Sequence, residues 1–241
     1  MAAKQILITG ATSGIGHALF EDYTAQGHQV IACGRNQEKL DSLKQKAALV
    51  CQFDMTDKQQ IATVSQHIDE LDVLILNAGN CRYIDDAKHF DGALFEDVIQ
   101  TNLIALGWLL QYLLPKVKKG GQVVFVSSSA SLLPFTRSEA YGASKAGVDY
   151  LANSLRLDLV KEGIDVTLIH PGFIKTPLTD KNDFPMPFLL TSEQASQRII
   201  KAVAQRKHYA HFPRRLTLLL KLFALLPSFV WQKLILKGNQ S

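Results

Sequence analysis

A glycine-rich turn near the N-terminus constrains the fold of this chain more than any other segment. The turn, Thr9-Gly-Ala-Thr-Ser-Gly-Ile-Gly16, follows the apolar run Gln5–Ile8 and precedes a helical pattern with Ala18, Leu19 and Tyr23 on its apolar face. Such glycines allow a tight bend, close approach of the backbone to a pyrophosphate, and close packing of helix on strand. The helix N-terminus adds unpaired amides and a positive dipole. The sequence therefore predicts a dinucleotide-binding unit, against the alternative of a glycine turn that binds nothing.

The rest of the chain alternates between short apolar runs and helical patterns. We expect strands at residues 5–8, 29–32, 48–53, 73–76, 123–126, 166–169 and 208–212. We expect helices at about 15–26, 36–46, 57–68, 94–118, 141–162 and 192–205. This alternation predicts a single-domain α/β fold, a Rossmann-type doubly wound parallel sheet with helices on both faces. The functional site is expected at the carboxyl ends of the strands.

Composition agrees with one domain. The 241 residues are 47% apolar and 20% charged, which suits an ordinary core, and no linker-like or repeated stretch divides them. We assign residues 1–193 to the binding and catalytic unit and 194–241 to a C-terminal extension of the same domain. Cys33, Cys51 and Cys81 are odd in number and lack metal-ligand spacing, which predicts no metal site and a reducing compartment. The N-terminus shows no basic and apolar leader.

A second motif, Tyr141-Gly-Ala-Ser-Lys145, carries candidate acid–base chemistry. Its spacing places a phenol and an ammonium on one face of a helix. A free tyrosine has a pKa of about 10, which is too high for easy proton exchange at neutral pH. Because a nearby positive charge lowers that pKa, we expect Lys145 to make Tyr141 a general acid and base. On spacing alone, the alternative is a solvated helix face.

Further motifs follow the glycine turn along the chain. They are Asn77-Ala-Gly79, Asn102, Ser128, Tyr141-x-x-x-Lys145 and Pro171-Gly-x-x-x-Thr176. Together with the Gly-x-x-x-Gly-x-Gly spacing of the turn, they resemble the short-chain dehydrogenase/reductase family. The resemblance is strong over about residues 4–176 and thin beyond about residue 190.

The resemblance implies a catalytic set of four residues, Asn102, Ser128, Tyr141 and Lys145. Tyr141 would exchange a proton with the substrate oxygen, and Ser128, selected by the family's interval of thirteen residues before the tyrosine, would polarise that oxygen. Lys145 would also bind the nicotinamide ribose. Asn102 would hold a water that joins Lys145 to solvent.

The resemblance also implies a nicotinamide dinucleotide cofactor. Its expected contacts are Gly10, Thr12, Ser13, Gly14, Ile15, Gly16, Arg35, Asp54, Met55, Asn77, Ala78, Gly79, Tyr141, Lys145, Pro171, Gly172, Ile174 and Thr176. Asp54 would bind the adenine amine beside the Met55 backbone. Its alternative is a helix N-cap, a role that Thr56 or Asp57 fits better. Ile174 and Thr176 would hold the nicotinamide carboxamide.

Cofactor choice is predicted from Cys33-Gly-Arg-Asn36, which follows the second strand. A carboxylate there would bind a ribose 2′-hydroxyl and repel a 2′-phosphate, and this segment has none. The planar guanidinium of Arg35 could pair with a 2′-phosphate, which favours NADP(H) over NAD(H). Many NADP-preferring relatives carry a basic residue where this chain has Ser13, and a solvated surface arginine is the alternative for Arg35.

Residues 177–190 correspond to the segment in which relatives carry a mobile substrate lid. The segment contains the large apolar side chains Phe184, Met186, Phe188 and Leu189. These would suit an apolar substrate, or would pack on the protein itself.

The C-terminal extension combines positive charge with apolar helical runs. Residues from Gln194 onward include nine Lys and Arg and no Asp or Glu, so a net charge of +4 for the chain leaves −5 on the first 193 residues. The runs 216–226 and 229–236 are interrupted by charge and proline and are shorter than the roughly 20 residues of a membrane span. Three interpretations remain: residues 214–241 lie on an anionic membrane, form a subunit interface or lid helix, or pack on the domain's own core. The absence of interleaved aromatic and basic residues predicts no nucleic-acid partner.

The sequence thus predicts an NADP(H)-dependent oxidoreductase that moves hydride between nicotinamide and a carbonyl or secondary alcohol. The substrate is expected to be a small apolar molecule, lipid-like or a cyclic ketone. The alternative is an NADP(H)-binding redox sensor or scaffold with little turnover. Family resemblance also implies a dimer or tetramer that pairs through the helices near 94–118 and 141–162. We expect the protein in the cytoplasm, either free or on a membrane.

Overall fold

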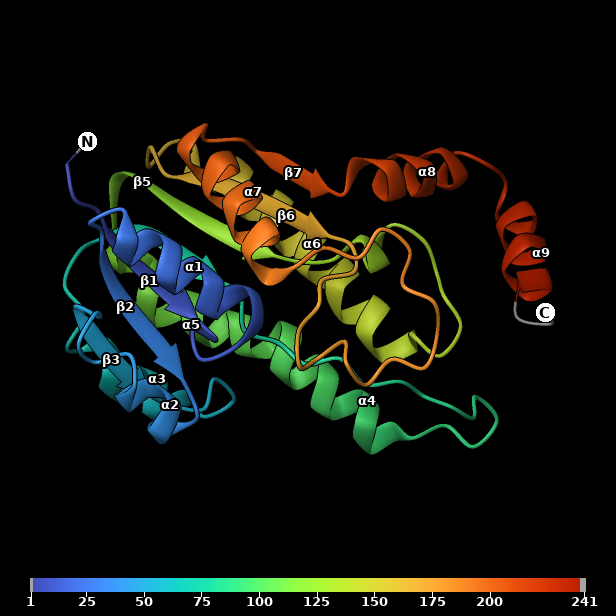
Figure 1. The fold of residues 1–241 in the computed structure, drawn as a ribbon, viewed down its shortest axis with the longest axis horizontal. Helices are drawn as coiled ribbons and strands as arrows, with labels where there is room; N and C mark the ends of the chain where they lie inside the picture. The colour runs from blue at the N-terminus through green and yellow to red at the C-terminus, as the bar shows by residue number, and fades with distance from the viewer. Residues whose placement is uncertain (1, 239–241) are drawn as a thin grey trace.

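Seven parallel strands form one sheet at the centre of the molecule (Figure 1). The structure, a computed structural model, describes residues 2–238; Met1, residues 239–241 and the side chains beyond Leu236 lie outside the description. The strand order is β3-β2-β1-β4-β5-β6-β7. The bounds are β1 Gln5–Thr9, β2 Gln29–Gly34, β3 Leu49–Gln52, β4 Leu71–Leu76, β5 Val117–Val126, β6 Asp165–Pro171 and β7 Tyr209–Phe212. The order reverses between β1 and β4, which is where doubly wound sheets bind their ligands.

Helices cover both faces of this sheet (Figure 1). They are α1 Gly14–Ala25, α2 Gln37–Asp41, α3 Lys58–Ser65, α4 Gly92–Ile99, α5 Ala105–Leu113, α6 Glu139–Leu159, α7 Ser192–Ala204, α8 Arg214–Ala224 and α9 Ser228–Gly238. The helices α1, α2 and α7 pack on one face, and α3, α5 and α6 pack on the other, with α4 against α6. The predicted α/β class and all seven predicted strands are confirmed.

Alternate residues of each strand enter opposite apolar layers. In β1, Ile6 and Ile8 join the layer that contains Phe20 of α1, whereas Leu7 joins the layer that contains Leu109 of α5. All five side chains are buried completely. Because both faces of a parallel sheet are covered, its strands are apolar at nearly every position. This explains why the strands could be found from short apolar runs.

The predicted helix over 94–118 is wrong in its detail. The structure has α4, a π-helical turn η1 at Gln100–Ile104, α5, and a short 3-10 turn η2 at Leu114–Lys116, after which β5 begins at Val117. Among the described residues, Gly92–Lys116 is also the one stretch whose length and composition would allow a membrane crossing. Its residues Leu106, Leu109 and Leu113 are instead buried against the sheet. The α5 part of this stretch therefore belongs to the helical layer that covers the sheet.

The C-terminal extension continues the domain and then projects from it (Figure 1). It begins within α7, adds β7 to the edge of the sheet and ends in α8 and α9, which are separated at Pro227. Leu216, Leu220 and Trp231 form a small apolar cluster with the segment that follows β5. The indole Nε1 of Trp231 donates to the carbonyl oxygen of Pro134 at 2.7 Å. One side of α8 and α9 is thus packed on the domain, which agrees with the interpretation that residues 214–241 pack on the domain's own core.

Candidate active site

An elongated cleft of about 590 Å³ runs along the carboxyl ends of the strands. It is lined by the glycine turn, by the ends of β2, β4, β5 and β6, by the N-terminal part of α6, and by residues 174–179. Every predicted cofactor contact except Gly16 lines this cleft, and so do Ser128, Tyr141 and Lys145. The fold therefore brings together residues that are up to 170 positions apart, roughly as the resemblance implied.

The glycine turn has the geometry that its spacing predicts. Gly10 and Gly14 have φ angles of +70° and +53°, which glycine adopts without the strain that other residues suffer. Gly16 lies behind the cleft: a Cβ at this position would stand 2.1 Å from the carbonyl oxygen of Gly10. Gly16 is therefore required for α1 to pack against the turn, and it does not line the cleft.

The N-terminus of α1 can hold an anionic group. Ser13 is its N-cap residue, with an extended backbone, and its side chain makes no capping hydrogen bond. The first turn of α1 also contains no acidic residue. Its amides and positive dipole therefore face the cleft without a competing carboxylate, and a pyrophosphate fits this position.

Thr9 joins the glycine turn to β4, and the sequence reasoning did not include it among the site residues. Its hydroxyl accepts hydrogen bonds from the backbone amides of Asn77 at 2.9 Å and Ala78 at 3.1 Å. The side-chain amide of Asn77 donates in return to the carbonyl oxygen of Thr9 at 3.0 Å. These bonds hold two walls of the cleft together. Its position at the end of β1, directly before Gly10, was the signal available in the sequence.

A positively charged group lies at the β2 end of the cleft. Arg35 lines it and is largely exposed, with its guanidinium 3.5 Å from a carboxylate oxygen of Asp54. Asp54 also accepts from the amide and hydroxyl of Thr56, and Asp57 caps α3, as the sequence suggested. Lys39 of α2 lines the same end and was not predicted. Its spacing of four from Arg35 could have indicated it.

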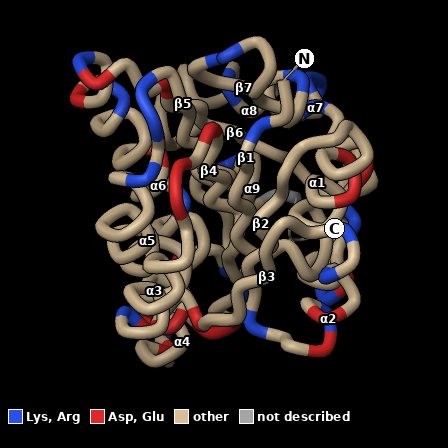
Figure 2. Tube along the Cα trace, turned by 90° about the vertical axis from the view of Figure 1, so that its left-hand side faces the viewer, with Lys and Arg blue, Asp and Glu red and all other residues tan. Residues whose placement is uncertain are grey.

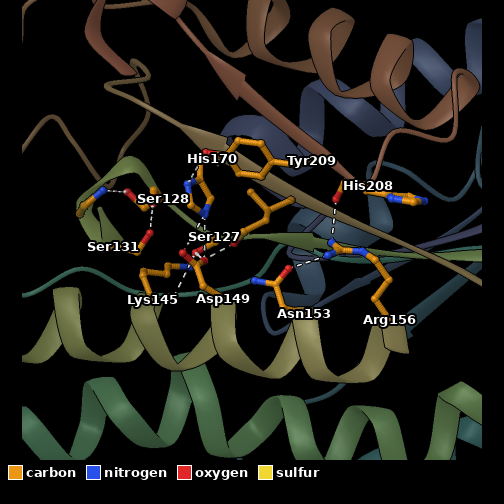
Figure 3. Close-up of polar contacts among 12 residues, drawn as sticks. Ser127, Ser128, Ser131, Lys145, Asp149, Asn153, Arg156, His170, His208 and Tyr209 are labelled. Atoms are coloured by element: carbon orange, nitrogen blue, oxygen red, sulfur yellow. Dashed lines mark hydrogen bonds and ion pairs between the residues drawn. The ribbon is translucent and has the colours of Figure 1, made fainter. Parts of the chain in front are cut away.

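The other end of the cleft holds the predicted serine, tyrosine and lysine. Of the three consecutive serines, Ser128 faces this end and its hydroxyl accepts from the amide of Ala130 at 3.1 Å, whereas Ser127 points away toward Asp149 (Figure 3). The ammonium of Lys145 lies 5.7 Å from the ring centroid of Tyr141 and donates to the carbonyl oxygen of Val126 at 3.1 Å. The geometry therefore favours Ser128 over its neighbours.

The electrostatics differ from the expectation for Tyr141. Burial raises the pKa of its phenol, and the nearby Ser128 hydroxyl lowers that pKa by less than burial raises it. Burial also lowers the pKa of Lys145 to about 8, against smaller opposing effects of Cys81 and Asp149. The expected lowering of the Tyr141 pKa by Lys145 is therefore not observed: desolvation is the largest influence on both groups, and it raises the pKa of the phenol and lowers that of the ammonium.

Asn102 is placed by the π-helical turn and is almost fully buried. Its carboxamide accepts from the amide of Asn80 at 2.8 Å, and it donates to the Asn80 carbonyl at 2.9 Å and to the Ser144 hydroxyl at 3.0 Å. Single π-helical turns often occur at functional sites, because the extra residue redirects a side chain. Here it directs Asn102 to the loop after β4, beside Gly79 and Lys145. The predicted water-holding role stays a prediction.

Comparison with known proteins identifies the family. The model of the short chain dehydrogenase family matches residues 4–185. An uncharacterized oxidoreductase of Myxococcus xanthus is 31% identical over 240 residues, which cover 95% of this chain and 94% of that protein. The chain belongs to the short-chain dehydrogenase family. As a member, it is an NAD(P)-dependent oxidoreductase of alcohol and carbonyl groups.

Other relatives of this short-chain dehydrogenase differ in what their names describe. A fatty acyl-CoA reductase of Acinetobacter baylyi is 34% identical, covering 84% of this chain and 74% of that protein. An NADP-dependent 3-hydroxy acid dehydrogenase of Escherichia coli is 31% identical, covering 70% of this chain and 72% of that protein. A serine dehydrogenase solved with NADP+ is 26% identical at a TM-score of 0.78, covering 86% and 94% of the two chains. A Burkholderia phymatum member solved with NAD shares the fold at a TM-score of 0.81 and 19% identity, covering 91% and 92%.

The loop after β6 that lines this cleft is stabilised by Thr179, which was not predicted. Its hydroxyl donates to the carbonyl oxygen of Ile174 at 2.6 Å and accepts from the amide of Thr176 at 3.0 Å. Thr179 also lines the cleft. Its position three residues after Thr176, where a side chain can close a turn, was the signal in the sequence.

The predicted lid, residues 177–190, is joined to Arg137 and to the loop after β4 by polar and aromatic contacts. Arg137 forms ion pairs with Asp183 of the lid at 2.8 Å and with Asp85 of the loop after β4 at 2.7 Å. Tyr83 of that loop donates to Asn182 at 3.0 Å, and its ring meets Phe184 edge to face. Arg137 has a φ of +63°, so its backbone is strained to reach both carboxylates.

Proposed function

We propose that this dehydrogenase uses NADP(H) to interconvert a carbonyl group and a secondary alcohol on a small apolar molecule. The observation that supports this best is the single continuous cleft between the cationic group at Arg35 and the Ser128, Tyr141 and Lys145 group. Its length and lining suit an extended dinucleotide with its nicotinamide at the catalytic end. The proposal extends the family's general activity to a cofactor and a class of substrate.

Each residue of the catalytic end has a role that its position allows. Bound nicotinamide would supply or accept the hydride. Ser128 orients the substrate oxygen, and the Tyr141 hydroxyl gives a proton to that oxygen in reduction or takes one in oxidation. Lys145 holds the nicotinamide ribose, and its charge favours loss of the Tyr141 proton. The turn at Gly10 and Gly14 and the N-terminus of α1 hold the pyrophosphate.

The preference for NADP(H) is supported by charge at the β2 end of the cleft. Arg35 and Lys39 both line it, and the residues directly after β2 include no acid. The named NADP-dependent relative and the NADP+-bound neighbour agree with this preference, whereas the NAD-bound neighbour shares too little sequence to bear on it. Asp54 sits 3.5 Å from Arg35 and would give up this pairing to a 2′-phosphate, which carries more charge.

We expect Arg35→Gln to weaken NADPH binding about ten- to a hundred-fold, because a hydrogen bond to a charged group contributes about 1.5–3 kcal/mol. NADH affinity should be unchanged, since NADH has no 2′-phosphate. Fluorescence titration with each cofactor measures both constants. Arg198→Gln, an exposed arginine of α7, is the matched control. Equal affinity of the unaltered protein for NADPH and NADH would refute the cofactor preference without affecting the family assignment.

The apolar character of the substrate is supported by the lid. Phe184 is half-buried and its ring contacts both Tyr83 and Phe173, while Leu178 lines the cleft. The fatty acyl-CoA reductase among the relatives points the same way. The competing sensor or scaffold function is not favoured, because a cofactor-binding sensor would not need the complete serine, tyrosine and lysine group.

We propose a homo-oligomer that pairs through α6 and its neighbours. Three large apolar side chains are at least 70% exposed: Tyr150 and Leu157 of α6, and Val160 directly after this helix; Ile104 of η1 is also exposed. Tyr150 and Leu157 are seven positions apart and therefore share one helix face. Burial of this face between two copies would remove it from water. A sedimenting mass equal to one chain at all concentrations would exclude this assembly.

We also propose that the outer side of α8 and α9 lies on an anionic lipid surface on the cytoplasmic side of a membrane. The exposed apolar residues of the two helices are Leu218, Leu219, Leu222, Leu225, Leu226, Phe229, Leu234 and Leu236. Arg214, Arg215 and Lys233 are exposed beside them, and no acidic residue follows Glu193. Elsewhere basic and acidic residues alternate along the chain, as around α2 (Figure 2). A second copy on this surface would oppose like charges, whereas anionic lipid would complement them.

Co-sedimentation with vesicles tests this surface. The protein should pellet with phosphatidylglycerol vesicles and stay in solution with phosphatidylcholine vesicles, because both charge and apolar area are needed. The double change Leu222→Ser and Leu225→Ser should reduce pelleting at least ten-fold. Phe90→Ser, at an exposed phenylalanine before α4 that belongs to neither proposed surface, is the matched control. If the protein stays in solution with anionic vesicles, the proposed lipid contact is wrong. If instead the double variant, and not the control, has a smaller sedimenting mass than the unaltered protein, the surface binds a second copy of the chain.

A further inference from the structure

A partly buried carboxylate lies directly behind the catalytic end of the cleft. Asp149 is on α6, one turn after Lys145, and its side chain points toward Ser127 at the end of β5 and toward His170 of β6 (Figure 3). The Ser127 hydroxyl donates to it at 2.6 Å, and Nε2 of His170 lies 2.9 Å from it. The Ser127 hydroxyl is also 3.2 Å from the carbonyl oxygen of Lys145. None of these contacts belongs to the catalytic roles described above.

The two residues that Asp149 contacts are each followed directly in the sequence by a residue of the cleft. Ser127 precedes Ser128 at the end of β5, and His170 precedes Pro171 and Gly172, which line the nicotinamide end of the cleft. A single carboxylate therefore fixes the ends of two strands relative to α6. Charge-assisted hydrogen bonds of this kind are shorter and stronger than neutral ones.

The His170 ring continues the network away from the cleft. Its Nδ1 lies 3.0 Å from the Tyr209 hydroxyl of β7, and the two rings meet edge to face. With its proton on Nε2, the ring donates to Asp149 and accepts from Tyr209, so that each polar atom has a partner. The ammonium of Lys221 on α8 lies over the outer face of the Tyr209 ring, 4.1 Å from the centroid. These partners hold the Asp149 carboxylate in one position.

Asp149 also acts on the charge of Lys145. The Lys145 ammonium is buried, and the one hydrogen bond found for it within the described chain is to the Val126 carbonyl. Burial lowers its pKa to about 8, while the negative charge of Asp149 opposes that change. The other titratable groups facing Lys145 are Tyr141 on the same helix and Cys81 in the loop after β4. Of these three groups, Asp149 is the carboxylate, a type of group that is ordinarily ionised near neutral pH.

We propose that Asp149 is a positioning residue and the counter-ion that keeps Lys145 protonated. It maintains the ammonium that holds the nicotinamide ribose, and through Ser127 and His170 it sets the positions of Ser128 and of the Pro171–Gly172 turn. This inference rests on the proposed roles of Ser128 and Lys145. Its main test measures the Lys145 ammonium itself, so it can fail while the proposed cofactor and substrate class hold.

The test follows the titration of Lys145 by 15N NMR in protein labelled at lysine Nζ, with Lys145→Met used to assign the signal. Asp149→Asn keeps the shape of the side chain and removes its charge. The titration midpoint should move to lower pH by about one pH unit, because an opposite charge has been removed from a buried site. NADPH should also bind more weakly to this variant at pH 8 than at pH 6.5, by about ten-fold more than in the unaltered protein.

Two further variants separate this effect from a loss of structure. Asp158→Asn removes an exposed carboxylate from the same helix and should leave the midpoint unchanged. His170→Gln keeps the Asp149 charge and its hydrogen bond from Ser127. The Lys145 titration midpoint of this variant should therefore stay at or above that of the unaltered protein. If Asp149→Asn does not fold, this variant provides the test. An unchanged midpoint in folded Asp149→Asn, or a midpoint one unit lower in His170→Gln, would overturn the proposal.

Discussion

Tyr141→Phe is expected to reduce turnover by about 10²–10⁴-fold, the usual contribution of a positioned proton donor. The aromatic ring is retained and should keep its position on α6. Only the hydroxyl that meets the substrate oxygen is lost. NADPH affinity should change little, because the proposed cofactor contacts of this region come mainly from Lys145 and the backbone. Steady-state kinetics with a ketone that the unaltered protein reduces, together with NADPH titration, measure the two effects separately.

Tyr150→Phe is the control, since Tyr150 lies on the same helix and is exposed. It should retain full turnover. If Tyr141→Phe also retained turnover, the proton role of Tyr141 would be wrong. If the unaltered protein bound NADPH but turned over no ketone or alcohol of a broad panel, the sensor function would become the better explanation.

Gly16→Ala is expected to have the second-largest effect, on cofactor binding and stability together. The new Cβ would stand 2.1 Å from the Gly10 carbonyl oxygen and 2.6 Å from the Asn77 amide nitrogen. Because the nearest contact is backbone, α1 must move away from the turn. Overpacking of this kind costs about 1–3 kcal/mol, and displacement of the α1 N-terminus should weaken NADPH binding at least ten-fold. Urea unfolding and fluorescence titration measure the two losses.

Gly92→Ala is the matched control for this change. Gly92 is the first residue of α4, its φ is not positive, and a Cβ there meets no atom within 4 Å. Alanine is a better helix former than glycine, so this variant should unfold at the same or higher urea concentration. A Gly16→Ala protein with unchanged stability and NADPH affinity would contradict this prediction, because it would show that α1 can move away from the turn with no loss of free energy of unfolding.

Local sequence patterns predicted most of the fold because every strand of a parallel sheet is buried on both faces. The run Gln5–Ile8 and its six counterparts were recognisable as strands for this reason. The region 94–118 was mispredicted because helical periodicity cannot reveal a π-helical turn, nor the change from helix to strand at Val117. Asp57 as a helix cap was predicted correctly, because its hydrogen bonds are to residues two and three positions away.

Candidate site residues could be predicted where they belong to a short sequence motif. Ser128 and Tyr141 were selected by spacing, and the structure places both in the cleft. Thr9 and Lys39 were missed because their contribution depends on which strand or helix lies opposite. The pKa of Tyr141 was expected to fall, whereas burial raises it, since helix spacing reports a neighbouring charge but not the loss of water around the phenol.

The sequence by itself determined the order of the strands along the chain, the glycine turn, the family and the candidate catalytic residues, because each depends on neighbours within a few positions or on a motif. Only the tertiary structure decided that Asp149 of α6 meets Ser127 of β5 and His170 of β6, and that α8 and α9 bury one side and leave the other exposed. The physical reason is that burial and hydrogen bonding between distant segments are properties of packing. A charged residue four positions after Lys145 could equally face solvent until the strands behind it are in place.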